Sequence, residues 1–190
     1  YDLTGGTASG MTDSKLPDGQ AGAEKALNHA LVGNAGANMI YESAGMHASL
    51  LGFSLESLVI DNDIIGATQR TIKGIEVNDE RLSFETIKDV CLNGPGHFLG
   101  SDQTLQLMQT EYLYPGVGDR KSPNEWNEQG GLDVAQRAMA KVEEILGHNF
   151  PSHVAEAVDA EIRRRFPVKL DRAHMLPPVD SAAARRVGSR

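Results

Sequence analysis

The sequence predicts the carboxyl-terminal part of a larger α/β protein in which helix predominates. Apolar residues recur at helical spacing along most of the chain, whereas only residues 38–42 have a clear strand pattern, with 1–4 as a second candidate. Two strands are too few for an independent sheet. The chain also begins with Tyr1 rather than methionine. We therefore expect further strands upstream, and a self-contained helical domain with one stray extended segment is the alternative.

The first predicted helix spans residues 20–35 and follows a glycine-rich opening. Its apolar positions are Ala23, Ala26, Leu27, Ala30 and Leu31. Their spacing is that of an amphipathic helix, which we expect to end at Gly33 or Gly36. Residues 38–42, with Met39, Ile40 and Tyr41 at their centre, are then predicted to form a short buried strand bounded by Gly36 and Gly45.

Two further helices carry the same start signal. Ser54 is the predicted N-cap of a helix that extends to about residue 74, and Ser83 that of a helix to about residue 93. Each serine lies between two apolar residues that are spaced to form a hydrophobic staple. Cys91 falls inside the second helix with no adjacent base, so we expect it to be a small core residue.

The rest of the chain alternates helix and loop. Ser101 or Asp102 caps a helix that Pro115 ends, and a polar loop with Pro123 and Trp126 follows.

A long helix is predicted at residues 135–146, closed by Gly147, and Ser152 opens another. Helical spacing then disappears, and lysine and arginine become frequent. We therefore divide the chain into a domain of residues 1–167 and a basic, flexible tail of residues 168–190.

Composition and charge exclude several classes of protein. The net charge of -8 argues against nucleic acid as a partner, and the single cysteine rules out a disulfide framework. No apolar run approaches the ~20 residues of a membrane helix, and the opening residues carry no signal-peptide pattern. The glycine-rich run 94–100 lacks the dinucleotide spacing, and His148 and His153 share no helix face. We expect a cytoplasmic protein with no metal site and no membrane partner.

The end of the predicted strand is the most suggestive segment. Tyr41 and Glu42 close the strand, and His47 follows shortly after. Strand carboxyl ends are where α/β folds build sites. Alternation would direct Tyr41 and Glu42 to opposite faces, so only one of them could face a barrel interior. A core tyrosine and a solvated glutamate are the alternative.

Several short runs, taken in order, extend over about residues 5–166. They are TDSKLPDGQAG at 12–22, GANMIY at 36–41, AGM at 44–46, FSLE at 53–56, VIDNDI at 59–64, GHFLG at 96–100, Asp119-Arg120 and Trp126. Together they resemble the trimethylamine methyltransferase superfamily. The resemblance implies the carboxyl-terminal portion of a (β/α)₈ TIM barrel.

The resemblance also implies a reaction. Members similar to this chain move a methyl group from a methylated amine to Co(I) of a cobalamin-type corrinoid that a separate partner protein carries. The chain lacks the Asp-x-His-x-x-Gly corrinoid-binding pattern, so it resembles the substrate-side enzyme, with no covalently bound cofactor. A quaternary ammonium such as glycine betaine leaves as a neutral amine without needing a proton, whereas trimethylamine needs activation. We expect a quaternary substrate, with trimethylamine as the other candidate, and a homo-oligomer.

Candidate site residues follow from that chemistry, because aromatic faces and carboxylates recognise such cations. The catalytic candidates are Glu42 and His97, the substrate-binding candidates are Tyr41, His47, Phe98 and Tyr112, and Met46 is the candidate for contact with the corrinoid. Simple packing is the alternative for Met46, and a loop contact is the alternative for His97. The alternative function is a noncatalytic helical interaction module or an inactive truncated relative.

Overall fold

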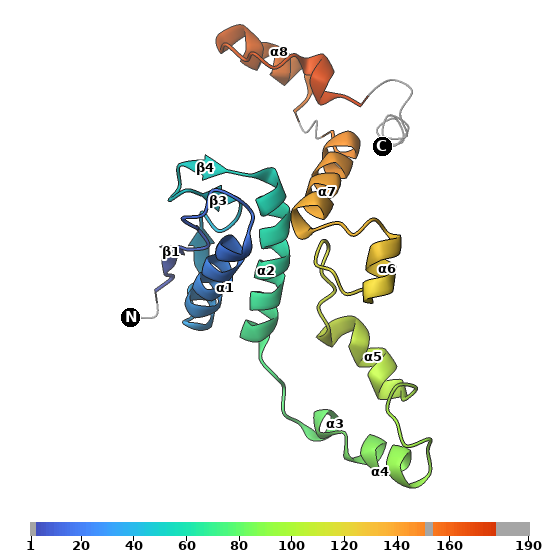
Figure 1. Cartoon of the computed structure of the whole chain (residues 1–190). Helices are drawn as coiled ribbons and strands as arrows, with labels where there is room; N and C mark the ends of the chain where they lie inside the picture. Colours follow the sequence, from blue (N-terminus) through green and yellow to red (C-terminus); the bar gives the residue numbers. More distant parts are fainter. Residues whose placement is uncertain (1–2, 151–153, 178–190) are drawn as a thin grey trace. The chain divides into compact units, whose positions relative to one another are not determined.

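The computed structural model describes residues 3–150 and 154–177 (Figure 1). The chain divides into two compact units, Tyr1–Ala138 and Met139–Arg190. The tail was expected at residues 168–190, and its part beyond residue 177 lies outside the described residues. Ser152, the predicted start of a helix, also lies outside them.

The first unit opens with two parallel strands joined by a helix. Strand β1 (Gly6–Ala8) pairs with β2 (Met39–Tyr41), and α1 (Gly19–Asn34) connects them. Parallel strands need such a crossover, and the β-α-β unit is the building block of α/β proteins. The predicted helix 20–35 and strand 38–42 are confirmed as elements, and the arrangement agrees with the predicted α/β class. The apolar stripe predicted for the helix is not its buried face, because Leu27 and Leu31 are exposed.

Strand β1 begins later than the candidate segment 1–4. The Asn38 side-chain oxygen accepts from the Gly5 N–H at 3.0 Å, and the Gly5 carbonyl accepts from the Asn38 N–H at 3.1 Å. These bonds join the two segments at Gly5, so strand pairing starts at Gly6. Leu3 and Thr4 are therefore outside the strand, contrary to the prediction, and residues 1–2 lie outside the described part.

Strand β2 is not buried as predicted. Alternation directs Ile40 toward the helices, where it lines a cavity of about 340 Å³ together with His29 and Ile72. Met39 and Tyr41 point to the other face and are 59% and 49% exposed. Among the described residues, no element covers that face, which explains the exposure.

A short hairpin and a long helix follow β2. Strand β3 (Met46–His47) pairs antiparallel with β4 (Gly52–Phe53), and α2 (Leu55–Lys73) begins directly afterwards. Ser54 caps α2 as predicted, because its hydroxyl oxygen accepts a backbone N–H of the first turn at 3.1 Å. Helix α2 ends at Lys73, with Gly74 as its C-cap, and lies beside α1 (Figure 1).

Helices α3 (Asp79–Leu82), α4 (Phe84–Leu92) and α5 (Asp102–Glu111) come next along the chain. The two longer ones confirm the predictions, and the four-residue α3 was too short to show a helical period. Ser101 caps α5 by accepting a backbone N–H at 3.3 Å. Helix α5 ends before Tyr112, earlier than predicted.

Two expectations for α4 are wrong. Ser83 directly precedes the helix, but its φ is 58° and its hydroxyl donates back to the Arg81 carbonyl at 3.1 Å instead of capping α4. Cys91 is exposed rather than in the core. Neighbouring helix positions point about 100° apart, and α4 buries Val90 instead.

A short helix, α6 (Pro123–Glu128), occupies the stretch predicted to be a polar loop. A capping box starts it: the Ser122 hydroxyl oxygen accepts from the Glu125 N–H, and the Glu125 carboxylate accepts from the Ser122 N–H. The Trp126 indole N–H donates to the Leu132 carbonyl at 2.9 Å, which ties the following loop to α6.

Helix α7 (Val134–His148) includes Gly147, which was predicted to close it. Helix α8 (Glu156–Arg165) confirms that a last helix exists, but it begins after Ala155 and not at Ser152 as predicted. A 3₁₀ turn at Arg172–Met175 lies in the segment expected to be a flexible tail. Asp159 of α8 holds this turn through a 3.1 Å ion pair with Arg172. Within residues 3–150 and 154–177, no helix combines the length and apolar character that crossing a membrane requires.

Candidate functional site

The carboxyl ends of β1 and β2 lie side by side, because the two strands are parallel. We call this end of the two-stranded sheet the strand edge. The Ser9 N–H donates to the Tyr41 carbonyl at 3.3 Å and joins the two strand ends. The Ser9 hydroxyl oxygen is buried and, among the described residues, has no hydrogen-bond partner. Such an atom is costly unless a further group or water meets it, so this edge is the candidate site.

Glu42 leaves β2 in an unusual backbone conformation. Its φ is 58°, in the left-handed region that residues other than glycine seldom adopt. This turn ends the alternation of strand β2 at Tyr41. The side chains of Tyr41 and Glu42 are both exposed. Strained backbone persists only where the surrounding structure holds it, so the contacts around Glu42 matter.

His29 of α1 holds the loops that follow both strands. Its Nε2 donates to the Ser43 carbonyl at 2.9 Å, because a carbonyl can only accept. Gly10 has φ +95°, and a Cβ built there would lie 2.3 Å from the His29 ring. Burial lowers the pKa of His29, while the Ser43 carbonyl and the nearby Asp61 oppose that shift. The imidazole is therefore neutral at neutral pH.

A buried ion pair holds the next part of the loop. Lys25 of α1 donates to Asp61 Oδ2 of α2 at 2.6 Å, and the Gly45 N–H donates to the same oxygen at 2.7 Å. The side chains of Lys25 and Asp61 are 1% and 2% exposed. The pair therefore connects both helices to the backbone three residues beyond Glu42.

His47 lies inside this polar network instead of at the open edge. Its Nδ1 donates to the Ser14 carbonyl at 3.0 Å, and its Nε2 is hydrogen-bonded to the Ser57 hydroxyl at 2.5 Å. The residue is buried. Both ring nitrogens bind protein groups, and His47 therefore braces the hairpin against α2.

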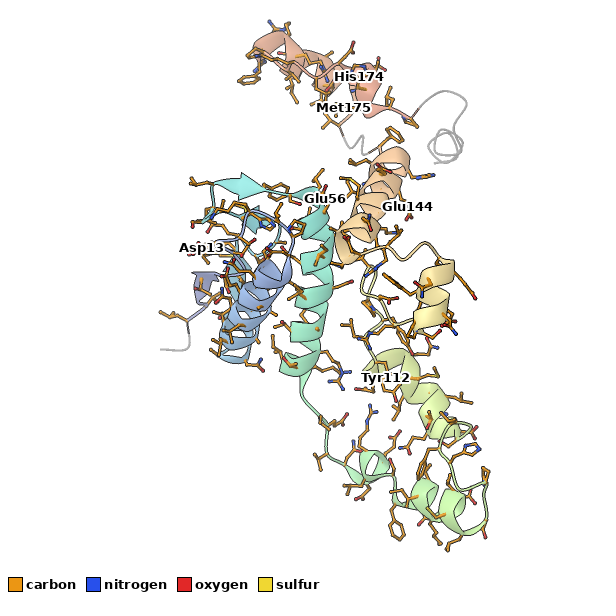
Figure 2. All side chains as sticks on the ribbon, in the orientation of Figure 1. Asp13, Glu56, Tyr112, Glu144, His174 and Met175 are labelled. Atoms are coloured by element: carbon orange, nitrogen blue, oxygen red, sulfur yellow. The ribbon has the colours of Figure 1, made fainter. Side chains whose placement is uncertain are left out.

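The loop between β1 and α1 is fixed from the other side. Glu24 accepts from the Thr12 hydroxyl at 2.6 Å and from the Asp13 N–H at 3.0 Å. The Thr12 hydrogen bond lowers the pKa of the Glu24 carboxyl. Asp13, labelled in Figure 2, accepts from the Ser49 hydroxyl at 2.5 Å and so links this loop to the hairpin.

Three more predicted site residues lie outside the helices: His97 and Phe98 between α4 and α5, and Tyr112 directly after α5. Phe98 and Tyr112 line the same cavity of about 270 Å³, and His97 lines a cavity of about 470 Å³ beside α4. Tyr112 lies at the end of α5 (Figure 2) and is 63% exposed. The structure therefore brings Phe98 and Tyr112 together at one cavity, whereas His97 lines another.

Met46 is partly buried in β3, opposite Phe53 of β4. This placement suits packing within the hairpin, the alternative considered for Met46. Among the described residues, no group of three or more histidine, cysteine or acidic side chains could hold a metal ion.

Sequence reasoning missed the buried network, although α1 carries a signal of it. Its buried positions recur every fourth residue and are Ala21, Lys25, His29 and Gly33. A lysine and a histidine on the buried stripe of a helix need partners, and Asp61 lies on the facing helix.

Comparison with known proteins gives consistent matches along this chain. The family model of trimethylamine methyltransferase (MTTB) matches residues 1–170. A trimethylamine methyltransferase of Methanosarcina acetivorans is 38% identical over 176 residues, which cover 91% of this chain and 33% of that protein. One from Desulfitobacterium hafniense is 34% identical over 163 residues, covering 86% and 32%. A glycine betaine methyltransferase of D. hafniense is 28% identical over 164 residues, covering 86% and 33%. The chain spans about a third of the length of these curated relatives.

Proposed function

The chain belongs to the trimethylamine methyltransferase family, and on that basis we propose that it is part of an enzyme that takes a methyl group from a methylated amine. The match over residues 1–170 carries this proposal. We propose Co(I) of a corrinoid on a separate protein as the methyl acceptor, and a (β/α)₈ barrel as the fold to which β1, α1 and β2 contribute. The parallel strand pair with its helical connection supports the barrel.

The proposed substrate is a quaternary amine of the glycine betaine type, with trimethylamine as the second candidate. When the acceptor takes the methyl carbon, the C–N bond breaks and its electron pair stays on nitrogen. A quaternary ammonium substrate therefore leaves as a tertiary amine with a neutral nitrogen, and no proton is required. The protein must chiefly bind, desolvate and align the cation.

The exposed edge offers groups suited to that task. Glu42 presents an exposed carboxylate, which attracts a cation, and Tyr41, the preceding residue, presents an exposed aromatic ring. Glu42→Gln keeps the size of the side chain and removes its charge. We expect this variant to lower kcat/KM for the amine about tenfold, the factor that corresponds to ~1.4 kcal/mol. An unchanged kcat/KM would remove Glu42 from the site.

The proposed function is tested with the protein expressed from its full reading frame. Purified protein, a Co(I) corrinoid protein and one amine at a time are mixed, and the loss of the Co(I) absorbance is followed. Glycine betaine, carnitine and trimethylamine are separate samples, and a sample without amine is the control. Amine-dependent loss of absorbance supports the enzyme and identifies its substrate. No reaction with any of these amines, in protein shown to be folded, would favour the noncatalytic interaction module.

A further inference from the structure

We propose that Asp61 is a positioning residue: from the middle of α2, its carboxylate fixes the loop that presents Glu42 at the strand edge. This inference rests on the proposed function. Asp61 does not touch the exposed edge itself, because its side chain is 2% exposed. Its action passes through the backbone of residues 42–45.

The loop after β2 is held at two points, Ser43 and Gly45. The carbonyl of Ser43 binds His29 at 2.9 Å, and the N–H of Gly45 binds Asp61 at 2.7 Å. Glu42 comes just before both anchors and has a positive φ of 58°. Since such a conformation needs support from its surroundings, loss of an anchor should release the carboxylate from its position.

The path of the chain at Gly45 is also restricted. Gly45 has φ +79°, and a Cβ built there would lie 2.3 Å from the Phe53 ring. The carbonyl of Gly45 accepts from the Ser54 N–H at 3.0 Å. The peptide groups on both sides of Gly45 are therefore bound to the amino-terminal half of α2 and its cap, and Asp61 supplies the side-chain contact.

Lys25 makes the charge of Asp61 tolerable in the interior. The two side chains are both buried, and one oxygen of Asp61 serves both Lys25 and Gly45. Removing one charge alone leaves the other buried without a partner, which destabilises the whole protein. A test of positioning must therefore remove both charges.

Two double variants separate positioning from stability. Lys25→Met with Asp61→Asn removes both charges and keeps an amide oxygen that can accept from Gly45. Lys25→Met with Asp61→Ala removes that acceptor as well. In the full-length protein we expect the Ala variant to have kcat/KM for the amine up to about tenfold below that of the Asn variant, because a misplaced Glu42 carboxylate can lose no more than the tenfold that its neutralisation in Glu42→Gln is expected to cost.

Asp63, two positions along the same helix, offers a matched control. Its carboxylate accepts from the N–H groups of Gly116, Val117 and Gly118 at 2.8, 2.9 and 3.0 Å, far along the chain from residues 42–45. Asp63→Asn should lower the melting temperature and leave kcat/KM of the folded protein unchanged.

A Glu42→Gln background distinguishes positioning from general damage. If Asp61 acts through Glu42, the difference between the Ala and Asn variants disappears when Glu42 is already neutral. Equal kcat/KM in the two double variants, or an equal drop in the Glu42→Gln background, would overturn the inference. An inactive wild-type protein would instead overturn the proposed function, so the two failures are distinguishable.

Discussion

Single residues at the strand edge are set by close contacts rather than by composition. Gly10 is the clearest case, since its φ of +95° and the nearby imidazole of His29 both require glycine. Gly36 offers a comparison, because its φ is +87° while a Cβ built there meets nothing within 4 Å. The two positions therefore separate backbone strain from crowding.

We predict that Gly10→Ala destabilises the protein more than Gly36→Ala does. Both variants strain the backbone, which costs about 1–2 kcal/mol. Only Gly10→Ala also pushes a methyl group into a filled space, which adds about 1–3 kcal/mol. Urea unfolding of the two variants beside the wild type measures both costs. Equal losses of unfolding free energy would show that His29 moves aside without cost.

We also predict that His29 makes stability depend on pH. Burial lowers its pKa below 6.5 in the folded protein, so the unfolded chain takes up a proton first as the pH falls. The contribution is fully present above pH 6.5 and is lost as the pH falls toward the folded pKa. One group changes the unfolding free energy by at most ~1.4 kcal/mol per pH unit.

Urea unfolding at pH 7.5 and at pH 5.5 measures this loss. The chain has six histidines, so the quantity to compare is the change between the two pH values in the wild type and in His29→Gln. The glutamine amide can still donate to the Ser43 carbonyl but does not titrate. The change should be smaller in His29→Gln, and an equal change in both proteins would contradict the prediction.

At the scale of elements, apolar periodicity and start signals together predicted most of the described helices, and the start signals failed where local geometry differs from the pattern. Ser54 and Ser101 cap helices as their sequence context indicates. The hairpin was not predicted, because its strands have two residues each and its turn places Ala48, Ser49 and Leu50 at positive φ without glycine. Ser83 has a suitable context but no cap bond.

We predict that Ser122→Ala destabilises α6 by about 1 kcal/mol, because the Ser122 side chain forms a capping box. Ser83→Ala should destabilise α4 by only a few tenths of a kcal/mol, because the Ser83 side chain makes no cap bond. Fluorescence of Trp126, the single tryptophan, reports on α6 directly. Amide hydrogen exchange in the first turns of both helices gives the two costs separately. Equal effects would mean that the Ser83 hydroxyl contributes as much through its bonds to the preceding turn.

For the whole molecule, the class of the fold and the strand end with Tyr41 and Glu42 could be predicted, but the internal arrangement could not. Lys25, His29 and Asp61 have the residue types of a solvated surface, and only their partners make their burial tolerable. Lys25 and Asp61 pair across α1 and α2, and His29 donates to the Ser43 carbonyl. Conversely, Met39 and Tyr41 have the residue types of a buried strand and are exposed. Whether a side chain is buried depends on facing elements, which the local pattern does not contain.

This exposure leads to a prediction for the 190-residue chain prepared alone. Large apolar side chains are exposed on several elements, with Leu51 at 90%, Ile75 at 86% and Leu99 at 80%. Extensive exposed apolar surface favours association. We expect the isolated chain to bind a hydrophobic dye and to sediment as oligomers whose size depends on concentration. Protein from the full reading frame should bind less dye per residue and keep a fixed oligomeric state. A monomeric, dye-free isolated chain would mean that its side chains repack to cover this surface without any partner.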